Sequence, residues 1–240
     1  MKKQERHHLK QNEFVLGVAK VTSWYQGNKD RATLVAGIVV LGVVLAAGYL
    51  WWQKRSAEQA GELMGVAMTI YQAPIVPPSS VPGAVQQPGS YPSEKARYEA
   101  ALKAFQDVAN TYGSSKSGIA ARYHAAETLF SLGRLNEAHQ EYQKVIDQGG
   151  STIYGSMAKL GLASTMLAEG QTDQAIKAYQ DLAAVRDGDV PVDGVLMQLA
   201  KAYEKTGKKA EARTTYKRVV DEFPDSPYAQ SARQQMTLLG

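Results

Sequence analysis

Small, aromatic and aliphatic residues recur along the second half of the chain at one fixed interval. The segments GRLNEAHQEYQKV (133–145), GQTDQAIKAYQDL (170–182) and GKKAEARTTYKRV (207–219) begin 37 residues apart and share glycine, alanine and tyrosine positions. ALKAFQDV (101–108) continues the series backward, with phenylalanine in the tyrosine position. Within each copy the alanine, the aromatic residue and the valine or leucine that follows it stand at i, i+4 and i+7, which is one face of an α-helix. The pattern predicts four amphipathic helices in register.

A second amphipathic helix precedes each of the three glycines. IAARYHAAETLFSLG (119–133) sets its alanine and leucine positions in phase with the two later copies. A residue in the left-handed conformation commonly makes the turn after such a helix. The predicted turn residues are Gly133, Gly170 and Gly207. The breaker-rich links DQGGS, RDGDVP and EFPDSP are predicted to be loops between successive pairs.

This repeated pair of helices resembles the tetratricopeptide repeat. The residues that carry the resemblance are the turn glycines with Ala138, Ala175, Ala212, Tyr142, Tyr179 and Tyr216. The usual period is about 34 residues, so each unit here is slightly long. The resemblance implies an all-α fold, a solenoid of helical hairpins, over residues 94–240. An ordinary helical bundle, the alternative, has no reason to keep a constant phase.

An uncharged apolar run, TLVAGIVVLGVVLAAGYLWW, occupies residues 33–52. Twenty helical residues extend about 30 Å, the thickness of the hydrocarbon core of a bilayer. Trp24 and Tyr25 precede the run, and Trp51 and Trp52 close it, as interfacial aromatic belts do. We therefore predict a single transmembrane helix at residues 32–52.

The basic residues predict how this helix is oriented. Seven lysines and arginines stand in the tail of residues 1–31, whereas only Lys54 and Arg55 follow the apolar run directly. Positive residues favour the cytoplasmic side. The tail is therefore predicted to be cytoplasmic and the repeats extracytoplasmic.

The charge distribution argues against a nucleic-acid partner, although the pI is about 9.0. Residues 1–31 carry a net charge of +4, whereas residues 56–240 carry 18 positive and 20 negative side chains. The basic character belongs to the tail, and the repeat region is close to neutral. Binding of nucleic acid is not predicted.

A cleaved signal peptide is the alternative to a retained anchor. VLAAG (44–48) offers small residues to a peptidase, but the apolar run exceeds the usual 7–15 residues of a signal peptide. A retained anchor is the preferred interpretation. The chain has no cysteine, which excludes disulfides and lipid attachment through cysteine.

The first repeat shows only its second helix before the chain reaches the apolar run. AEQAGELMGVAMTIYQA (57–73) has apolar residues at helical spacing and is our candidate for the missing first helix. On this hypothesis residues 53–93 comprise a juxtamembrane helix and a proline-rich linker within residues 74–92. The alternative makes residues 57–92 a flexible stalk. At the other end, SPYAQSARQQMTLLG (226–240) is predicted to be a capping helix with a polar outer face.

No motif for catalysis, a metal or a cofactor was found. The four histidines, His7, His8, His124 and His139, lack a second ligand at a metal-binding spacing. There is no glycine-rich phosphate loop and no nucleophile elbow. We therefore predict neither an enzyme nor a bound cofactor.

The tetratricopeptide resemblance implies a concave groove lined by the first helices. Three columns of in-phase residues are the candidates for binding a partner. They are Tyr123, Leu160 and Met197; Phe130, Leu167 and Glu204; and Glu127, Ser164 and Lys201. The first two columns are mainly apolar and suit an apolar or helical segment of a partner. The alternative is that curvature of the solenoid buries these side chains.

The whole arrangement resembles the ancillary subunit of the bacterial Sec translocon. RHHLKQNEF (6–14) and the repeat at residues 118–145 carry this resemblance. It implies a single-pass protein of the bacterial inner membrane with a periplasmic repeat domain. Its implied partners are Sec translocon subunits, periplasmic chaperones or translocating chains. The repeats are also similar to the periplasmic cell-division coordinator and to outer-membrane assembly lipoproteins, so an envelope scaffold is the alternative function.

Overall fold

The computed structural model describes residues 19, 27, 29–78, 87–150, 152–185 and 188–240. Most of the predicted cytoplasmic tail and the middle of the proline-rich linker therefore lie outside the described residues. The chain divides into two compact units, Met1–Arg55 and Ser56–Gly240.

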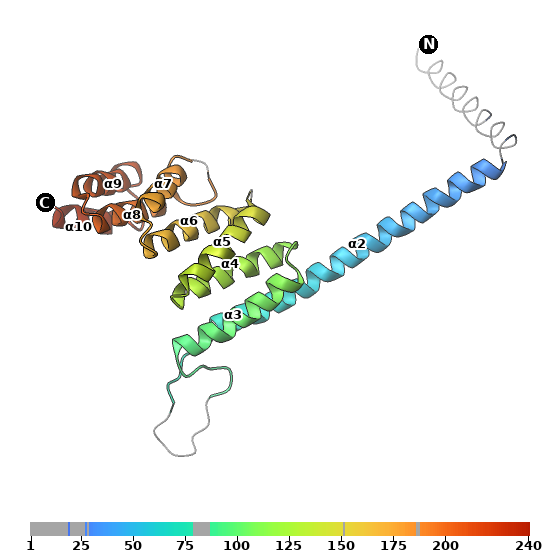
Figure 1. Cartoon of the computed structure of the whole chain (residues 1–240), viewed down its shortest axis with the longest axis horizontal. Helices are drawn as coiled ribbons and strands as arrows, with labels where there is room; N and C mark the ends of the chain where they lie inside the picture. Colours follow the sequence, from blue (N-terminus) through green and yellow to red (C-terminus); the bar gives the residue numbers. More distant parts are fainter. Residues whose placement is uncertain (1–18, 20–26, 28, 79–86, 151, 186–187) are drawn as a thin grey trace, which may run out of the picture. The chain divides into compact units, whose positions relative to one another are not determined.

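The described residues form nine α-helices and no β-strand (Figure 1). The helices are α2 (Lys29–Tyr71), α3 (Glu94–Thr111), α4 (Lys116–Ser131), α5 (Leu135–Gly149), α6 (Ile153–Ala168), α7 (Thr172–Ala183), α8 (Val192–Lys205), α9 (Lys209–Glu222) and α10 (Ala229–Leu238). This part of the chain is all-helical, as its hydrophobic pattern predicted.

The first unit contains the apolar part of α2. The large apolar side chains between Leu34 and Trp52 are more than half exposed, and none of the apolar window is buried. This helix is long and apolar enough to cross a membrane, a test that a signal sequence near the N-terminus also passes. Arg55 lies 5.6 Å from the ring of Trp51, which places a cation over the aromatic end of the run.

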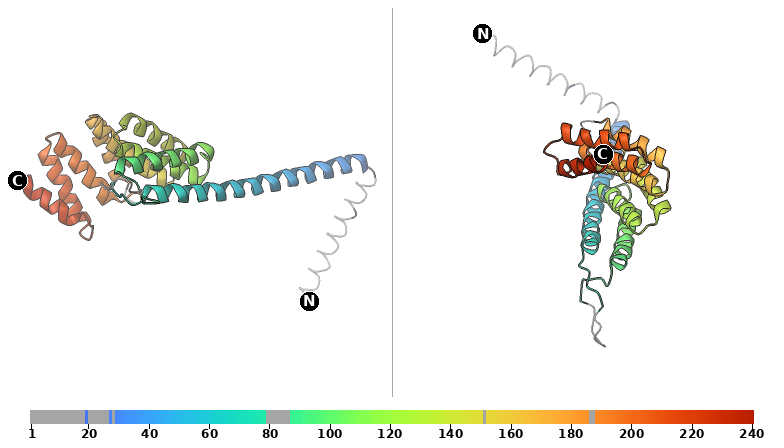
Figure 2. Two further views of the ribbon diagram at one scale, coloured as in Figure 1. Left: turned by 90° about the horizontal axis from the view of Figure 1, so that it is seen from below. Right: turned by 90° about the vertical axis from the view of Figure 1, so that its left-hand side faces the viewer.

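The second unit is a series of helical hairpins, which Figure 2 shows from two further sides. The pairs α4–α5, α6–α7 and α8–α9 are each closed by the predicted glycine, with φ of +73°, +85° and +73°. The N–H of the residue after each glycine bonds a carbonyl five residues back. These bonds are Arg134 to Leu129 at 2.9 Å, Gln171 to Met166 at 2.8 Å and Lys208 to Tyr203 at 2.9 Å. The prediction of left-handed turns is confirmed.

The small and aromatic positions of the repeat form the centre of each hairpin. The alanines are fully buried and the aromatic residues are at most 3 % exposed. They are Ala101, Ala138, Ala175 and Ala212 with Phe105, Tyr142, Tyr179 and Tyr216. Because alanine has almost no side chain, the paired helices approach closely and the aromatic ring fills the space beside it.

The second part of α2 provides the first helix that the sequence of the first repeat lacks. Ala60 and Ala67 are fully buried. The ring of Tyr71 lies 5.7 Å from Tyr98 and 5.9 Å from Phe105 of α3. Residues 57–71 therefore pack as a helix against α3, and the flexible-stalk alternative is wrong for this stretch.

The two ends of the proline-rich linker are hydrogen-bonded to each other. The Tyr91 N–H donates to the Pro74 carbonyl at 3.0 Å, and the Val76 N–H donates to the Tyr91 carbonyl at 2.9 Å. Arg97 also reaches the Ala73 carbonyl, at 3.4 Å. The described ends of the linker thus close the turn between α2 and α3.

The turns between hairpins contain an in-phase signal that our sequence analysis missed. Ser115 and Thr152, 37 residues apart, cap α4 and α6 by accepting bonds from the N–H groups of Gly118 and Gly155. A Cβ atom on either glycine would overlap the backbone of the preceding turn. The next link differs, because α8 begins after Pro191 and has no side-chain cap.

Helix α10 covers the open end of the last hairpin. Ala229 and Ala232 are 4 % and 0 % exposed, whereas Gln230, Arg233 and Gln234 lie in solvent. The apolar side therefore packs and the outer side is wet, as a capping helix requires.

The core of the second unit consists of two hydrophobic clusters that meet within α6. The first cluster contains residues from Ala67 to Leu162, and the second contains residues from Ala163 to Ala232. We refer to them below as the first and second core clusters.

Candidate functional site

A groove of about 500 Å³ lies on the first helices of the hairpins. Its walls come from α2, α4, α6 and α8 and from the loop that precedes α8. The lining residues are Tyr71, Tyr123, Glu127, Phe130, Ser131, Tyr142, Ile153, Met157, Leu160, Gly161, Ser164, Asp189, Val190, Pro191 and Gln198. Most of these side chains are aromatic or aliphatic, which is typical of a surface that binds another molecule.

Glu127 is the carboxylate at the α4 wall of the groove. Its Oε1 accepts a bond from the Tyr123 hydroxyl at 2.8 Å, and its Oε2 lies 2.9 Å from Nδ1 of His124. The side chain of Glu127 remains 34 % exposed. Two neighbours on the same helix therefore hold the carboxylate in place while leaving it accessible from the groove.

Burial raises the pKa of Tyr123, and the negative charge of Glu127 and the bond to it raise this pKa further. Tyr123 therefore stays protonated and keeps donating its hydrogen bond to Glu127. Burial also raises the pKa of Tyr142. The tyrosine hydroxyls of the groove thus act as neutral donors at physiological pH.

Packed aromatic rings form the base of the groove. Tyr123 lies 6.0 Å from Tyr142 and 5.7 Å from Tyr154, and His124 stacks on Phe105 at 5.4 Å. Such ring pairs fix each other's orientation and exclude water. The groove surface is therefore set by rings that are themselves packed.

Gly161 allows Tyr142 to reach the groove. A Cβ atom at this position of α6 would overlap the Tyr142 ring, which lies directly against the helix backbone. Gly161 and Tyr142 both line the groove. A glycine in the middle of α6 is thus explained by this close approach of an aromatic ring.

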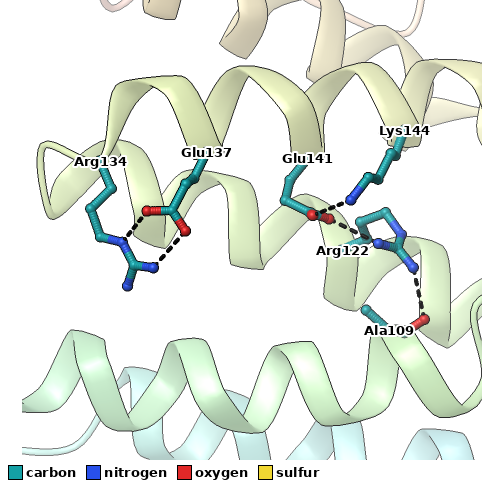
Figure 3. A network of polar contacts seen from close by, with 6 residues as sticks. All are labelled: Ala109, Arg122, Arg134, Glu137, Glu141 and Lys144. Atoms are coloured by element: carbon teal, nitrogen blue, oxygen red, sulfur yellow. Dashed lines mark hydrogen bonds and ion pairs between the residues drawn. The ribbon is translucent and has the colours of Figure 1, made fainter.

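A polar network joins α4 to α3 and α5 (Figure 3). Arg122 donates to Oε2 of Glu141 on α5 at 2.8 Å and to the Ala109 carbonyl of α3 at 3.0 Å. Lys144 donates to the other oxygen of Glu141 at 2.7 Å. Because Arg122 precedes Tyr123, this network on three helices sets the rotation of α4 that turns Tyr123 toward the groove.

The charged residues that line the groove are acidic. Glu127 and Asp189 contribute carboxylates, and the lining includes no lysine or arginine. Asp189 accepts a bond from Ser156 at 3.1 Å. The described residues contain no group of three or more potential metal ligands. The groove is therefore suited to binding through apolar contacts and negative charge.

A larger hollow, of about 610 Å³, lies between α7, α8 and α9. Its lining is mainly small or polar, including Ala184, Ala210 and Thr214. Gln180 and Tyr203 on its walls bond each other at 2.7 Å. This hollow offers few large apolar side chains to a partner, so we take the groove with the aromatic base as the candidate site.

Comparison with known families agrees with the hairpin architecture. The family model described as "Tetratricopeptide repeat-like domain" matches residues 22–238. The chain belongs to this tetratricopeptide repeat-like family. No curated protein sequence matches the chain.

Solved structures of similar fold are tetratricopeptide repeat proteins. A putative kinesin light chain from Podosopora anserina with TPR-like repeats has 14 % identity and a TM-score of 0.57, covering 76 % of this chain and 86 % of its own. MamA has 18 % identity and a TM-score of 0.48, covering 60 % and 78 %. YrrB, titled a TPR protein with an unusual peptide-binding site, has 16 % identity and a TM-score of 0.45, covering 57 % and 66 %. At these identities the first likeness shows the fold alone.

Five of the nine candidate residues named from the sequence line the groove of this tetratricopeptide repeat-like protein. They are Tyr123, Glu127, Phe130, Leu160 and Ser164. They come from α4 and α6, the first helices of two consecutive hairpins. Residues of all three predicted columns therefore lie in one groove on these two helices. Ser164 is held there by bonds to the Leu160 carbonyl and the Tyr179 hydroxyl.

The other four candidates lie outside the lining of the groove. Met197 is 4 % exposed and packs in the second core cluster. Leu167 is partly buried against the same cluster, and Lys201 is exposed outside the lining of the groove. Glu204, the remaining member of the apolar columns, is also absent from the lining. The three candidates on α8, Met197, Lys201 and Glu204, thus lie outside the groove, whereas their neighbour Gln198 lines it.

Sequence reasoning missed several lining residues, chiefly Tyr71, Ile153, Met157 and the loop residues 189–191. Tyr71 belongs to residues 57–73, the candidate for the missing first helix, but the predicted columns of the groove do not include it. The link RDGDVP had been interpreted only as a helix breaker. Ile153 is in phase with Lys116 and Val190, and Met157 is in phase with Ala120 and Gly194. These positions do not share one residue type, so the repeat pattern gives no consistent signal for them.

Proposed function

We propose that this protein is a single-span protein of the bacterial inner membrane whose periplasmic repeat domain binds partner polypeptides in the groove. In this proposal it is an ancillary component of the Sec translocon that passes emerging chains to periplasmic chaperones. Tetratricopeptide-like repeats are in general modules of protein–protein interaction, and the lining of the groove fits that role.

The observation that carries the proposal is the composition of α2. Its first part is an exposed apolar helix of membrane-spanning length, and its second part belongs to the core of the repeat domain through Ala67. The family match begins at residue 22, ahead of the apolar helix. In this proposal one helix combines the anchor with the first repeat, and the apolar composition of its first part supports a binding module that works next to a membrane.

The groove supports polypeptide partners because its apolar side chains are partly accessible. Ile153 is 51 % exposed on its rim, and Met157 and Leu160 are half-buried. An apolar segment of a partner would cover these residues in the helix-in-groove mode. Chains that emerge from a translocon are unfolded and present such segments.

The anchor is tested by mass and by topology. We expect the purified protein to retain residues 1–52, and a phosphatase fused after Gly240 to be active in the periplasm. A mature protein that begins after the apolar helix, or a phosphatase that is inactive, would contradict the proposed anchor and orientation.

The partner is tested by photo-crosslinking in cells from Ile153 in the groove. Val66 of α2, which is 57 % exposed and does not line the groove, is the matched control position. We expect translocon subunits, chaperones or translocating chains to crosslink at position 153 and not at position 66. Crosslinks to lipid or to a second copy alone would overturn the translocon role. Capture of other envelope proteins only would instead favour the scaffold function.

A further inference from the structure

The groove combines tyrosine side chains with negative charge, which is an arrangement suited to a cation. Glu127 and Asp189 are its charged lining residues, and no lysine or arginine stands among them. The rings of Tyr71, Tyr123 and Tyr142 line the same space. A guanidinium or ammonium group is attracted both to carboxylates and to aromatic faces.

Glu127 retains acceptor capacity for such a group. Each of its oxygens has one partner, the Tyr123 hydroxyl or the His124 ring, whereas an ionised carboxylate offers about four acceptor positions. Its side chain is 34 % exposed, so a partner can reach it. The two existing contacts hold the carboxylate fixed, which reduces the ordering cost when a cation binds.

The nearby arginines do not neutralise this carboxylate. Arg122, on the same helix, pairs with Glu141 at 2.8 Å. Arg97 lies over the ring of Tyr98 at 4.9 Å and pairs with Glu94 at 3.6 Å. Neither arginine lines the groove. The acidic character of the groove is therefore available to an incoming positive charge.

From charge complementarity we infer that the groove selects partner segments in which an arginine or lysine stands among apolar residues. The positive side chain pairs with Glu127 beside the tyrosine rings, and the flanking apolar residues cover Ile153, Met157 and Leu160. Asp189, in the loop before α8, lines the same groove and adds to the attraction. This inference rests on the proposed function, because it names the chemistry of the polypeptide that the groove takes.

Two synthetic peptides that differ in one residue test this inference. Both are 14-residue helices of leucine and alanine, and the central residue is arginine in one and citrulline in the other. Citrulline keeps the shape of arginine without its charge. Binding is measured to the full chain in phosphatidylcholine nanodiscs, with empty nanodiscs subtracted, because a zwitterionic lipid does not favour the charged peptide.

We expect the arginine peptide to bind about tenfold more tightly than the citrulline peptide, as one charge-assisted contact provides. Glu127→Gln should abolish this preference, and Asp189→Asn should reduce it about two- to threefold, since a rim charge contributes less. Glu137→Gln is the matched control. Glu137 lies outside the groove and pairs with Arg134 at 2.6 Å, so this variant should keep the full preference.

Equal affinity of the two peptides for the unaltered protein would overturn the inference and leave the proposed function standing. A preference that persists in Glu127→Gln, with native circular dichroism, would also overturn it. Failure of both peptides to bind would overturn the inference and the proposed binding groove together. The crosslinking experiment from Ile153 tests the translocon role independently of these outcomes.

Discussion

The two core clusters of the repeat domain are built on one repeat but contain different chemistry. The first cluster includes Phe105 and Tyr142 and is accompanied by the packed rings of Tyr71 and His124. All ring–ring contacts recorded for the described residues of the second unit lie on this side. The second cluster buries Tyr179 and Tyr216 among aliphatic residues such as Leu196, and none of its described rings contacts another ring.

This difference shows that positions in phase do not have the same environment. Tyr123, Leu160 and Met197 are 37 residues apart, yet the first two line the groove and the third packs in the second core cluster. His124, Gly161 and Gln198 are also 37 residues apart and also differ in their surroundings. At these positions an imidazole stacks on Phe105 and a bare backbone meets the Tyr142 ring, whereas Gln198 only lines the groove. Side-chain volume at each position decides whether a hollow forms.

Removal of Phe105 should give the largest effect and tests whether the two clusters are separate units. Phe105 is fully buried, and Phe105→Ala should lower the free energy of unfolding by about 4 kcal/mol. Because stacked repeats contact mainly their neighbours, we expect amide protection to fall more in α3–α5 than in α8–α9. Hydrogen exchange of the full chain in mild detergent measures this.

The matched variant in the second cluster is Leu196→Ala, at another fully buried position. Its loss of protection should be greatest in α8 and α9. An equal loss of amide protection over all helices in both variants would show that the repeat domain unfolds as a single cooperative unit. The two clusters would then not be separate units of stability.

Gly155→Ala should destabilise the turn between the first two complete hairpins. A Cβ atom at residue 155 would overlap the backbone of Gly149, so the turn must shift, at about 3 kcal/mol. Thermal unfolding measures the loss. Gly65→Ala is the control, because no atom lies within 4 Å of its Cβ position and alanine favours a helix by about 1 kcal/mol. A stable Gly155→Ala variant would show that this turn is not constrained.

Glu141→Gln should weaken the polar network that holds α4 in the first cluster. The guanidinium of Arg122 is only 11 % exposed and would lose its charged partner, which costs about 2 kcal/mol. The control is Glu137→Gln, whose pair with Arg134 is about half exposed and contributes less than about 0.5 kcal/mol. Denaturant unfolding compares the two, and equal losses would contradict the role of the network.

Tyr123→Phe should have the smallest effect at neutral pH, about 1 kcal/mol for the lost bond to Glu127. Burial raises the folded-state pKa of Tyr123, whereas the unfolded value is about 10. The stabilisation by the protonated tyrosine is therefore complete below pH about 10 and is lost as the pH rises toward the folded pKa.

The measurement for this prediction is the slope of unfolding free energy against pH above about 10. Tyr123→Phe should make the decline shallower by up to about 1.4 kcal/mol per pH unit, because one titrating group has been removed. Tyr179→Phe makes the same comparison in the second cluster, since burial also raises the pKa of Tyr179. An unchanged slope in Tyr123→Phe would contradict the assignment to Tyr123.

The sequence alone was sufficient for the helical repeat, because its determinants are local and periodic. The interval of 37 residues, the alanine and tyrosine faces and the left-handed glycines follow from helix geometry and backbone sterics. The apolar run and the amphipathic face of residues 57–71 are equally local signals. For these elements the structure agrees with the pattern, including the helix that completes the first pair.

The tertiary structure decided which surface is open. Met197 packs in the core, whereas Tyr71 of α2 and the loop at residues 189–191, which are far apart in the sequence, line the same groove. The bond from Arg122 to the Ala109 carbonyl likewise joins α4 to α3 of the preceding hairpin, a contact between hairpins that the period does not encode. A repeat pattern specifies the interface within a hairpin. The side-chain volumes and the loop between hairpins determine how successive hairpins rotate, and this rotation sets the accessibility of each column.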